Sequence, residues 1–119
     1  MTGAKSARAA RRIGLAIANS PLVKTAIAGG DANWGRIVMA VGKSGEAIAE
    51  TSLDILVGGH VVARKGAPPP DYYETPVARH MAGRNIEIVV DVGVGRGKAT
   101  VWTCDLTHGY IEINADYRS

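Results

Sequence analysis

The 119-residue sequence contains a single cysteine, Cys104, so it cannot form an internal disulfide and fits a reducing compartment. No apolar run reaches the ~20 residues that a membrane-spanning helix needs. Residues 1–12 lack the apolar segment of a secretory signal. The net charge of +3 is too small to argue for nucleic acid as a partner. We therefore expect a cytoplasmic protein that binds neither membrane nor nucleic acid.

The signatures of a self-contained active site are also missing. His60, His80 and His108 are scattered rather than paired at zinc-ligand spacing, and there is no cysteine pair. No serine occupies a Gly-x-Ser-x-Gly elbow, although a Ser/His/Asp arrangement formed by folding stays open. Cys104 falls in an expected strand, where a small buried hydrophobic residue is the better interpretation than a nucleophile. We expect no metal site, no cofactor and no catalytic residue in this chain alone, and we expect His60 at the surface.

What the sequence does contain is typical of one globular domain. Apolar residues make up 46% of it and charged residues 21%. Its length is enough for a modest core. The fifteen glycines lie between apolar runs, so they indicate tight turns rather than disorder.

The prediction of the fold starts from the segment Leu22 to Gly45. Its apolar run Leu22–Ile27 indicates a buried strand. Gly29 and Gly30 then allow a turn, and Asp31 and Asn33 are good N-caps for a helix that starts at Trp34 and that Gly42 and Gly45 stop. A glycine turn before a helix N-terminus can bind an anion, but an empty βα connection is the more common case and we favour it. Asp31, Asn33, Trp34 and Arg36 are thus given structural roles.

Other patterns complete an α+β fold, a compact α/β roll with helices packed on one mixed or antiparallel sheet built largely of hairpins. Residues 3–18 form an amphipathic helix with Ser6 as its N-cap and a basic face, interpreted as solvated rather than as a binding surface. The other expected elements are a hairpin over 47–65 turning at Gly58-Gly59, an extended connector at Pro68–Pro70, a helix over 72–82, a hairpin over 85–104, a last strand through 110–113 and a turn at 114–116.

The loop Gly93–Lys98 superficially resembles a phosphate-binding loop. It departs from the P-loop pattern because Val92 displaces the first glycine and Ala99 stands where Ser or Thr follows the lysine. It also joins two expected strands rather than a strand and a helix. We interpret it as a flexible hairpin tip.

Two sequence motifs, GGDANWGRI at residues 29–37 and INADYRS at residues 113–119, are quite specific. Together with GAKSARAARRIGLAIANSPLVKTA near the start, they make essentially all 119 residues resemble one family. This family is the ornithine acetyltransferases, or glutamate N-acetyltransferases, of arginine biosynthesis. The likeness is to the C-terminal domain of their β chain.

The resemblance implies transfer of acetyl from N-acetylornithine to glutamate by a ping-pong route. It implies that the nucleophile is the N-terminal threonine of the β chain, freed by self-cleavage of a precursor. Thr2 does not match that threonine, which the family places upstream. Asn114 and Ser119 correspond to substrate-binding positions of the family, and their amide and hydroxyl suit an amino-acid ligand.

The implied partners are the N-terminal remainder of the enzyme, meaning the α chain and the first part of the β chain, in an oligomer, with ornithine, N-acetylornithine and glutamate as ligands. A non-catalytic, stand-alone module that binds an amino acid or mediates assembly is the alternative. A nucleic-acid binder that uses the face with Lys5, Arg8, Arg11 and Arg12 ranks third.

Overall fold

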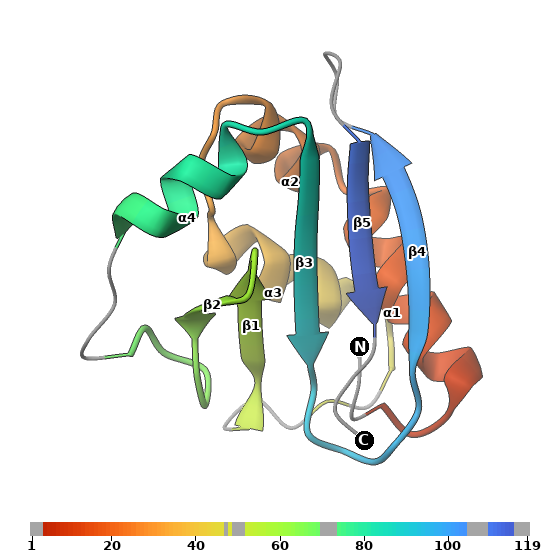
Figure 1. Cartoon of the computed structure of the whole chain (residues 1–119). Helices are drawn as coiled ribbons and strands as arrows, with labels where there is room; N and C mark the ends of the chain where they lie inside the picture. Colours follow the sequence, from red (N-terminus) through yellow and green to blue (C-terminus); the bar gives the residue numbers. More distant parts are fainter. Residues whose placement is uncertain (1–3, 47, 49–51, 70–73, 105–109, 116–119) are drawn as a thin grey trace.

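Helices and strands follow the predicted order with one exception, near the N-terminus (Figure 1). The computed structural model describes residues 4–46, 48, 52–69, 74–104 and 110–115. The elements in this part of the chain are α1 (Ala7–Ala18), α2 (Pro21–Ala28), α3 (Trp34–Lys43), β1 (Asp54–Val57), β2 (His60–Ala63), α4 (Glu74–Met81), β3 (Asn85–Asp91), β4 (Ala99–Cys104) and β5 (Tyr110–Ala115).

The strands form one mixed sheet in the order β2-β1-β3-β5-β4. The hairpin predicted over 47–65 is confirmed as β1 and β2, which turn at Gly58 and Gly59. The hairpin predicted over 85–104 is wrong, because β5 lies between β3 and β4. β5 pairs parallel to β3 and antiparallel to β4. Residue alternation specifies a strand but carries no information on its partner, so this insertion could not be seen in the pattern. The predicted α+β class, with helices on a mixed sheet, is confirmed.

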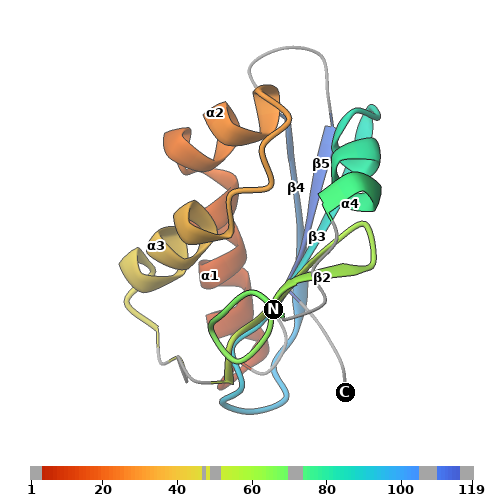
Figure 2. The ribbon, with the colours of Figure 1, turned by 90° about the vertical axis from the view of Figure 1, so that its left-hand side faces the viewer.

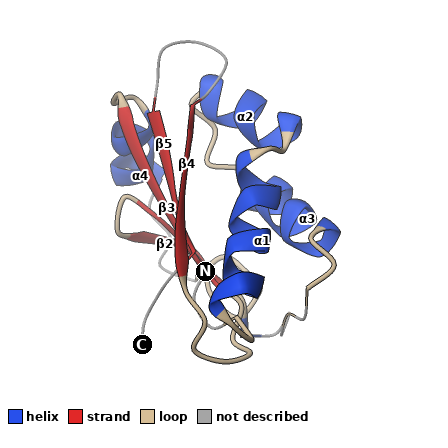
Figure 3. Ribbon diagram, turned by 90° about the vertical axis from the view of Figure 1, so that its right-hand side faces the viewer, coloured by secondary structure: helices blue, strands red, loops and turns tan. Residues whose placement is uncertain are grey.

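Three helices lie on one side of the sheet, as the two side views show (Figures 2 and 3). α1 packs against β4 and β5, and also contacts α2 and α3. The core lies between this helical layer and the sheet, and α4 adds Val77 and Met81 to it. Its largest fully buried side chains are Ile13, Ile17, Val41, Leu53, Ile55, Val57, Val62, Val77, Ile88 and Ile113. α4 lies apart from the helical layer, beside the start of β3 (Figure 1).

The strand predicted over Leu22–Ile27 is wrong, because this segment is the helix α2. Ser20 caps it by accepting a hydrogen bond from the Val23 backbone N–H at 3.3 Å, and Pro21 occupies the first turn, where its missing N–H costs nothing. The buried residues Val23, Ala26 and Ile27 are spaced three and four apart, which is one helix face. A six-residue apolar run fits a short buried helix as well as a strand, and the N-terminal cap decides between them here.

The predicted N-caps Ser6 and Asn33 are confirmed, whereas Asp31 is not the N-cap of α3. The Ser6 hydroxyl accepts from the Ala9 N–H at 3.1 Å, and the Asn33 side chain accepts from the Arg36 N–H at 3.1 Å. Of the two glycines predicted to stop α3, Gly42 does not, since the helix runs through it to Lys43. Gly45 follows with a φ of 77°. Pro68 and Pro69 lie outside any helix or strand, as predicted, whereas Pro70 and the residues before Glu74 are outside the described part of the chain.

The loop from Gly93 to Lys98 is packed against neighbouring backbone, so its prediction as a flexible hairpin tip is wrong. Ala4 and Gly97 exchange two backbone hydrogen bonds, of 3.3 and 2.8 Å. A Cβ on Gly95 would lie 2.8 Å from the Ala4 carbonyl oxygen, and one on Gly97 would collide with the Ser6 carbonyl. The alternating glycines therefore leave room for the segment that leads into α1 rather than for a phosphate.

Candidate functional site

Of the two predicted substrate-binding residues, the structure describes the main chain of one. Asn114 lies in β5, with its Cα opposite Thr100 of β4 and Val89 of β3. The turn predicted at 114–116 is wrong for Asn114 and Ala115, which continue the strand. Ser119 is outside the described residues, as are Thr2 and His108. The structure thus places Asn114 in an interior strand with a paired neighbour on each side.

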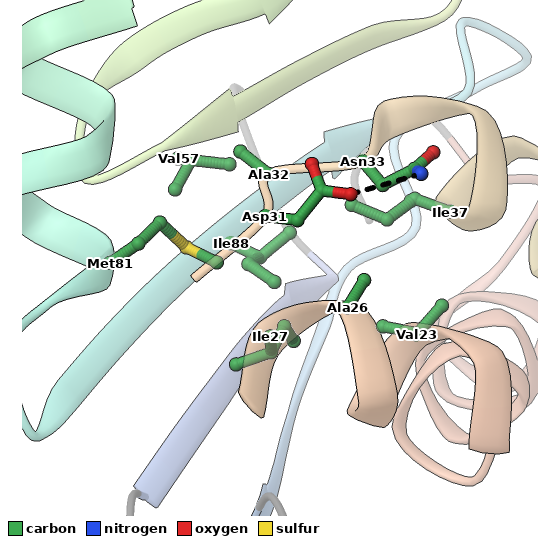
Figure 4. A pocket seen from close by; sticks show the side chains of 10 residues that line it. All are labelled: Val23, Ala26, Ile27, Asp31, Ala32, Asn33, Ile37, Val57, Met81 and Ile88. Carbon is green, nitrogen blue, oxygen red and sulfur yellow. Dashed lines mark hydrogen bonds between the residues drawn. The ribbon is translucent and has the colours of Figure 1, made fainter. Parts of the chain in front are cut away.

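The glycine turn before α3 borders a small pocket (Figure 4). The Asn33 side-chain amide donates to the Asp31 carboxylate at 3.3 Å, and the Arg36 guanidinium donates to the Leu22 carbonyl at 2.9 Å. The rest of the lining is apolar: Val23, Ala26, Ile27, Ala32, Ile37, Val57, Met81 and Ile88. The space inside is about 10 Å³, which holds roughly one water molecule and not an amino acid. The polar residues hold the turn and cap α3, in keeping with the structural role predicted for them.

The histidines do not form a catalytic group in the described part of the chain. His60 is exposed, as predicted. His80 lies in the last turn of α4, and its Nε2 accepts a hydrogen bond of 2.9 Å from the Glu87 backbone N–H. No group of three or more His, Cys, Asp or Glu side chains that could hold a metal ion occurs among the described residues.

Charged side chains near the sheet and on α1 have structural or solvent-facing positions. Asp91 is only 4% exposed, and its carboxylate accepts from the Gly93 N–H at 2.9 Å, which fixes the turn after β3. Lys5, Arg8 and Arg11 are exposed, and the interpretation of this face as solvated rather than binding stays a prediction. Arg12, whose side chain is 60% exposed, pairs with Glu46 at 3.2 Å, and such surface pairs contribute little to stability.

The prediction that Cys104 is buried is wrong, because it is exposed at the end of β4. The hydroxyl of its neighbour Thr103 donates to the Ala18 carbonyl of α1 at 3.3 Å, so Thr103 faces the helical layer. Since side chains alternate along a strand, Trp102 and Cys104 face the opposite way. Trp102 is 69% exposed. Sequence reasoning missed this tryptophan, because alternation alone does not tell which side of a strand the helices cover.

No helix in the described part of the chain has both the length and the apolar character needed to cross a membrane.

Comparisons with known proteins agree on one family. The model of the ArgJ family matches residues 1–119. The arginine biosynthesis bifunctional protein ArgJ of Zymomonas mobilis is 60% identical over 119 residues, which are all of this chain and 29% of that protein. The Ruegeria pomeroyi protein of the same name is 61% identical, again over 29% of its length. A crystal structure of ArgJ from Bacillus halodurans has a TM-score of 0.84 and 36% identity, over 90% of this chain and 50% of that one. The chain thus spans less than a third of the length of these curated relatives.

Proposed function

The chain belongs to the ArgJ family, and on that premise we propose that it forms the C-terminal part of a glutamate N-acetyltransferase of arginine biosynthesis. In the complete enzyme, acetyl would move from N-acetylornithine to glutamate. The observation that carries the proposal is the family match over the whole chain, joined to relatives named as arginine biosynthesis bifunctional proteins. The remainder of the enzyme, an α chain and the first part of the β chain, would supply the threonine nucleophile. The proposal includes an oligomeric, cytoplasmic enzyme.

In this proposal the chain contributes Asn114 and Ser119 to the amino-acid site and no catalytic residue. An amide both donates and accepts hydrogen bonds, and a hydroxyl does the same, so the pair can bind the α-amino and α-carboxylate groups of ornithine or glutamate. The position of Asn114 in the sheet supports its proposed role in the amino-acid site. Its main chain is paired with β3 on one side and β4 on the other, so the strand that carries it is firmly placed.

Activity in a chimera tests the proposal. The chimera is the Zymomonas mobilis relative with its matched 119 residues replaced by this chain, which aligns over its full length. We expect the purified chimera to transfer labelled acetyl from N-acetylornithine to glutamate, while this chain alone does not. A folded chimera that transfers no acetyl would overturn the proposed function.

Asn114→Ala in the chimera tests the predicted site. Loss of a hydrogen bond to a charged ligand group is worth about 1.5–3 kcal/mol, so kcat/KM for N-acetylornithine or glutamate is expected to fall by about tenfold or more. Asn19→Ala is the matched control, because Asn19 is exposed at the end of α1 and caps that helix through its backbone N–H. Equal kcat/KM values for the two variants would contradict a role of Asn114 in the amino-acid site.

A further inference from the structure

One face of β5 and β4 is not covered by any described element. α1, α2 and α3 lie behind β3, β5 and β4 in the view of Figure 1, and the described residues place nothing in front of β5 and β4 (Figure 1). In the side views α1, α2 and α3 lie on one side of the sheet, while α4 lies on the other side near β3 and away from β4 (Figures 2 and 3). We call the uncovered side the open sheet face and define it by Glu87, Thr100, Trp102, Cys104 and Glu112.

The open sheet face combines a large apolar side chain with acidic ones. Trp102 is 69% exposed, the highest value among the exposed large hydrophobic residues of the described chain. Glu112 of β5 lies opposite Trp102 in the register, and Glu87 of β3 lies opposite Glu112. Thr100 and Cys104, two positions before and after Trp102, are exposed as well. A surface of this chemistry suits a partner with an apolar recess and cationic side chains beside it.

The sheet topology also indicates that this face has a covering. β3 and β5 pair in parallel, and parallel pairing is typical of sheets that are covered on both faces. In this chain one face of the pair packs on helices, and on the other face Glu87 is exposed while Val89 and Glu112 are half-buried. Domains complete such a sheet with a second layer.

The greater length of the relatives points to the occupant of the open sheet face. The matched 119 residues are 29% of the Zymomonas mobilis relative, so 71% of that protein (100 − 29) has no counterpart here. The Bacillus halodurans structure contains this fold within a chain twice the matched length, since 50% of that chain is covered. The additional residues of these relatives are therefore the occupant that we consider for the open sheet face.

From these observations we propose that the open sheet face is the surface on which the rest of an ArgJ-family protein docks, with Trp102 in an apolar recess of that part and Glu112 beside a cationic side chain. The proposal rests on family membership and on the exposed face, and it does not depend on which substrates the enzyme uses.

The only cysteine of the chain reports on this face directly. Cys104 is exposed and lies two residues from Trp102 on the same side of β4. The experiment compares the alkylation rate of Cys104 by iodoacetamide in this chain alone and in the chimera with the Zymomonas mobilis relative, using mass spectrometry of the Cys104 peptide. We expect alkylation to be at least tenfold slower in the folded chimera. Equal rates would overturn the proposal.

Variants test the role of Trp102 and supply a matched control. Trp102→Ala is expected to lower the thermal midpoint of the chimera and to restore the Cys104 alkylation rate, with little effect on the stability of this chain alone. Met39→Ala is the control, because Met39 is 52% exposed on α3 in the helical layer. It is expected to leave the alkylation rate unchanged. Equal effects of the two variants on the chimera would contradict the proposed role of Trp102.

The outcomes separate this proposal from the proposed function. A chimera that protects Cys104 but transfers no acetyl would overturn the function and support the docking surface. A chimera that transfers acetyl while Cys104 stays fully reactive would support the function and overturn the docking surface. The other occupant to test is a second copy of this chain, and light scattering of the chain alone detects it. A dimer that Trp102→Ala dissociates would overturn docking of the rest of the protein on this face.

Discussion

At the scale of single residues, His80 joins α4 to two strands. Its Nε2 accepts from the Glu87 N–H at 2.9 Å, and the Gly58 N–H donates to the Glu87 carbonyl at 2.9 Å. The turn of the β1–β2 hairpin and the end of α4 therefore meet at one residue of β3. The imidazole ring lies against Gly58, where a Cβ would collide with it. The hydrogen bond requires a neutral ring with its proton on Nδ1.

Gly58→Ala tests this contact. Gly58 has a φ of 59°, which costs an L-residue about 1–2 kcal/mol, and the new methyl group also displaces His80 and its hydrogen bond, worth about 1 kcal/mol more. Gly59→Ala is the matched control, with a φ of 81° and nothing within 4 Å of the added Cβ. Urea unfolding is expected to show a larger loss for Gly58→Ala, by about 1 kcal/mol or more. Equal losses would mean that the His80 contact is not energetically important.

Some residue roles were predictable from sequence and others were not. The caps Ser6 and Asn33 follow from local chemistry, because a side chain bonds to a backbone N–H three residues on. The exposure of Cys104 and Trp102 does not, since it depends on which side of β4 the helix α1 covers. That side is determined by contacts between α1 and β4, which are far apart in the chain.

At the scale of secondary structure elements, α2 shows how a helix start outweighs a strand-like composition. The run Leu22–Ile27 is apolar enough for a buried strand, yet Ser20 and Pro21 begin a helix just before it. The Thr25 hydroxyl donates to the Pro21 carbonyl at 2.7 Å, which is a contact within the helix. An apolar run by itself fits either element, so the strand prediction fails because it leaves this helix start out.

Two substitutions in this segment distinguish a helix from a strand. Ser20→Ala removes the N-cap and is expected to lower the free energy of unfolding by about 1 kcal/mol. Thr25→Ala replaces a poor helix former at an exposed site with the best one, so its effect is expected to be neutral or slightly stabilising. In a strand the same change would be destabilising. Chemical denaturation of both variants measures these differences, and a clear loss for Thr25→Ala would contradict the helix.

At the scale of the whole molecule, the sheet order makes β5 an interior strand. It is hydrogen-bonded to β3 on one side and to β4 on the other, while β2 lies at the edge. Amides of β3 and β5 are expected to exchange with solvent more slowly than those of β2, by tenfold or more, because interior strands open only with the whole fold. Hydrogen–deuterium exchange with mass spectrometry measures this, and β2 peptides as protected as those of β5 would contradict it.

The candidate site reflects the same division between local and distant information. The sequence indicates strands at 85–104 and 110–113 from their alternation, and family likeness points to Asn114. Neither indicates that Asn114 lies in an interior strand beside Val89 and Thr100. The parallel pairing of β3 and β5 joins segments that are separated by β4 in the chain, so it depends on the packing of the whole domain.

The inserted strand has a consequence for how the chain is made. β3 and β4 leave the ribosome before β5, yet they are neighbours only through it. At about 5–20 residues per second, their unpaired edges are exposed during synthesis until Ala115 has emerged. An incomplete translation product that stops after Cys104 would therefore present one free edge of β3 and a wholly unpaired β4 to other nascent chains, which is the arrangement that leads to aggregation.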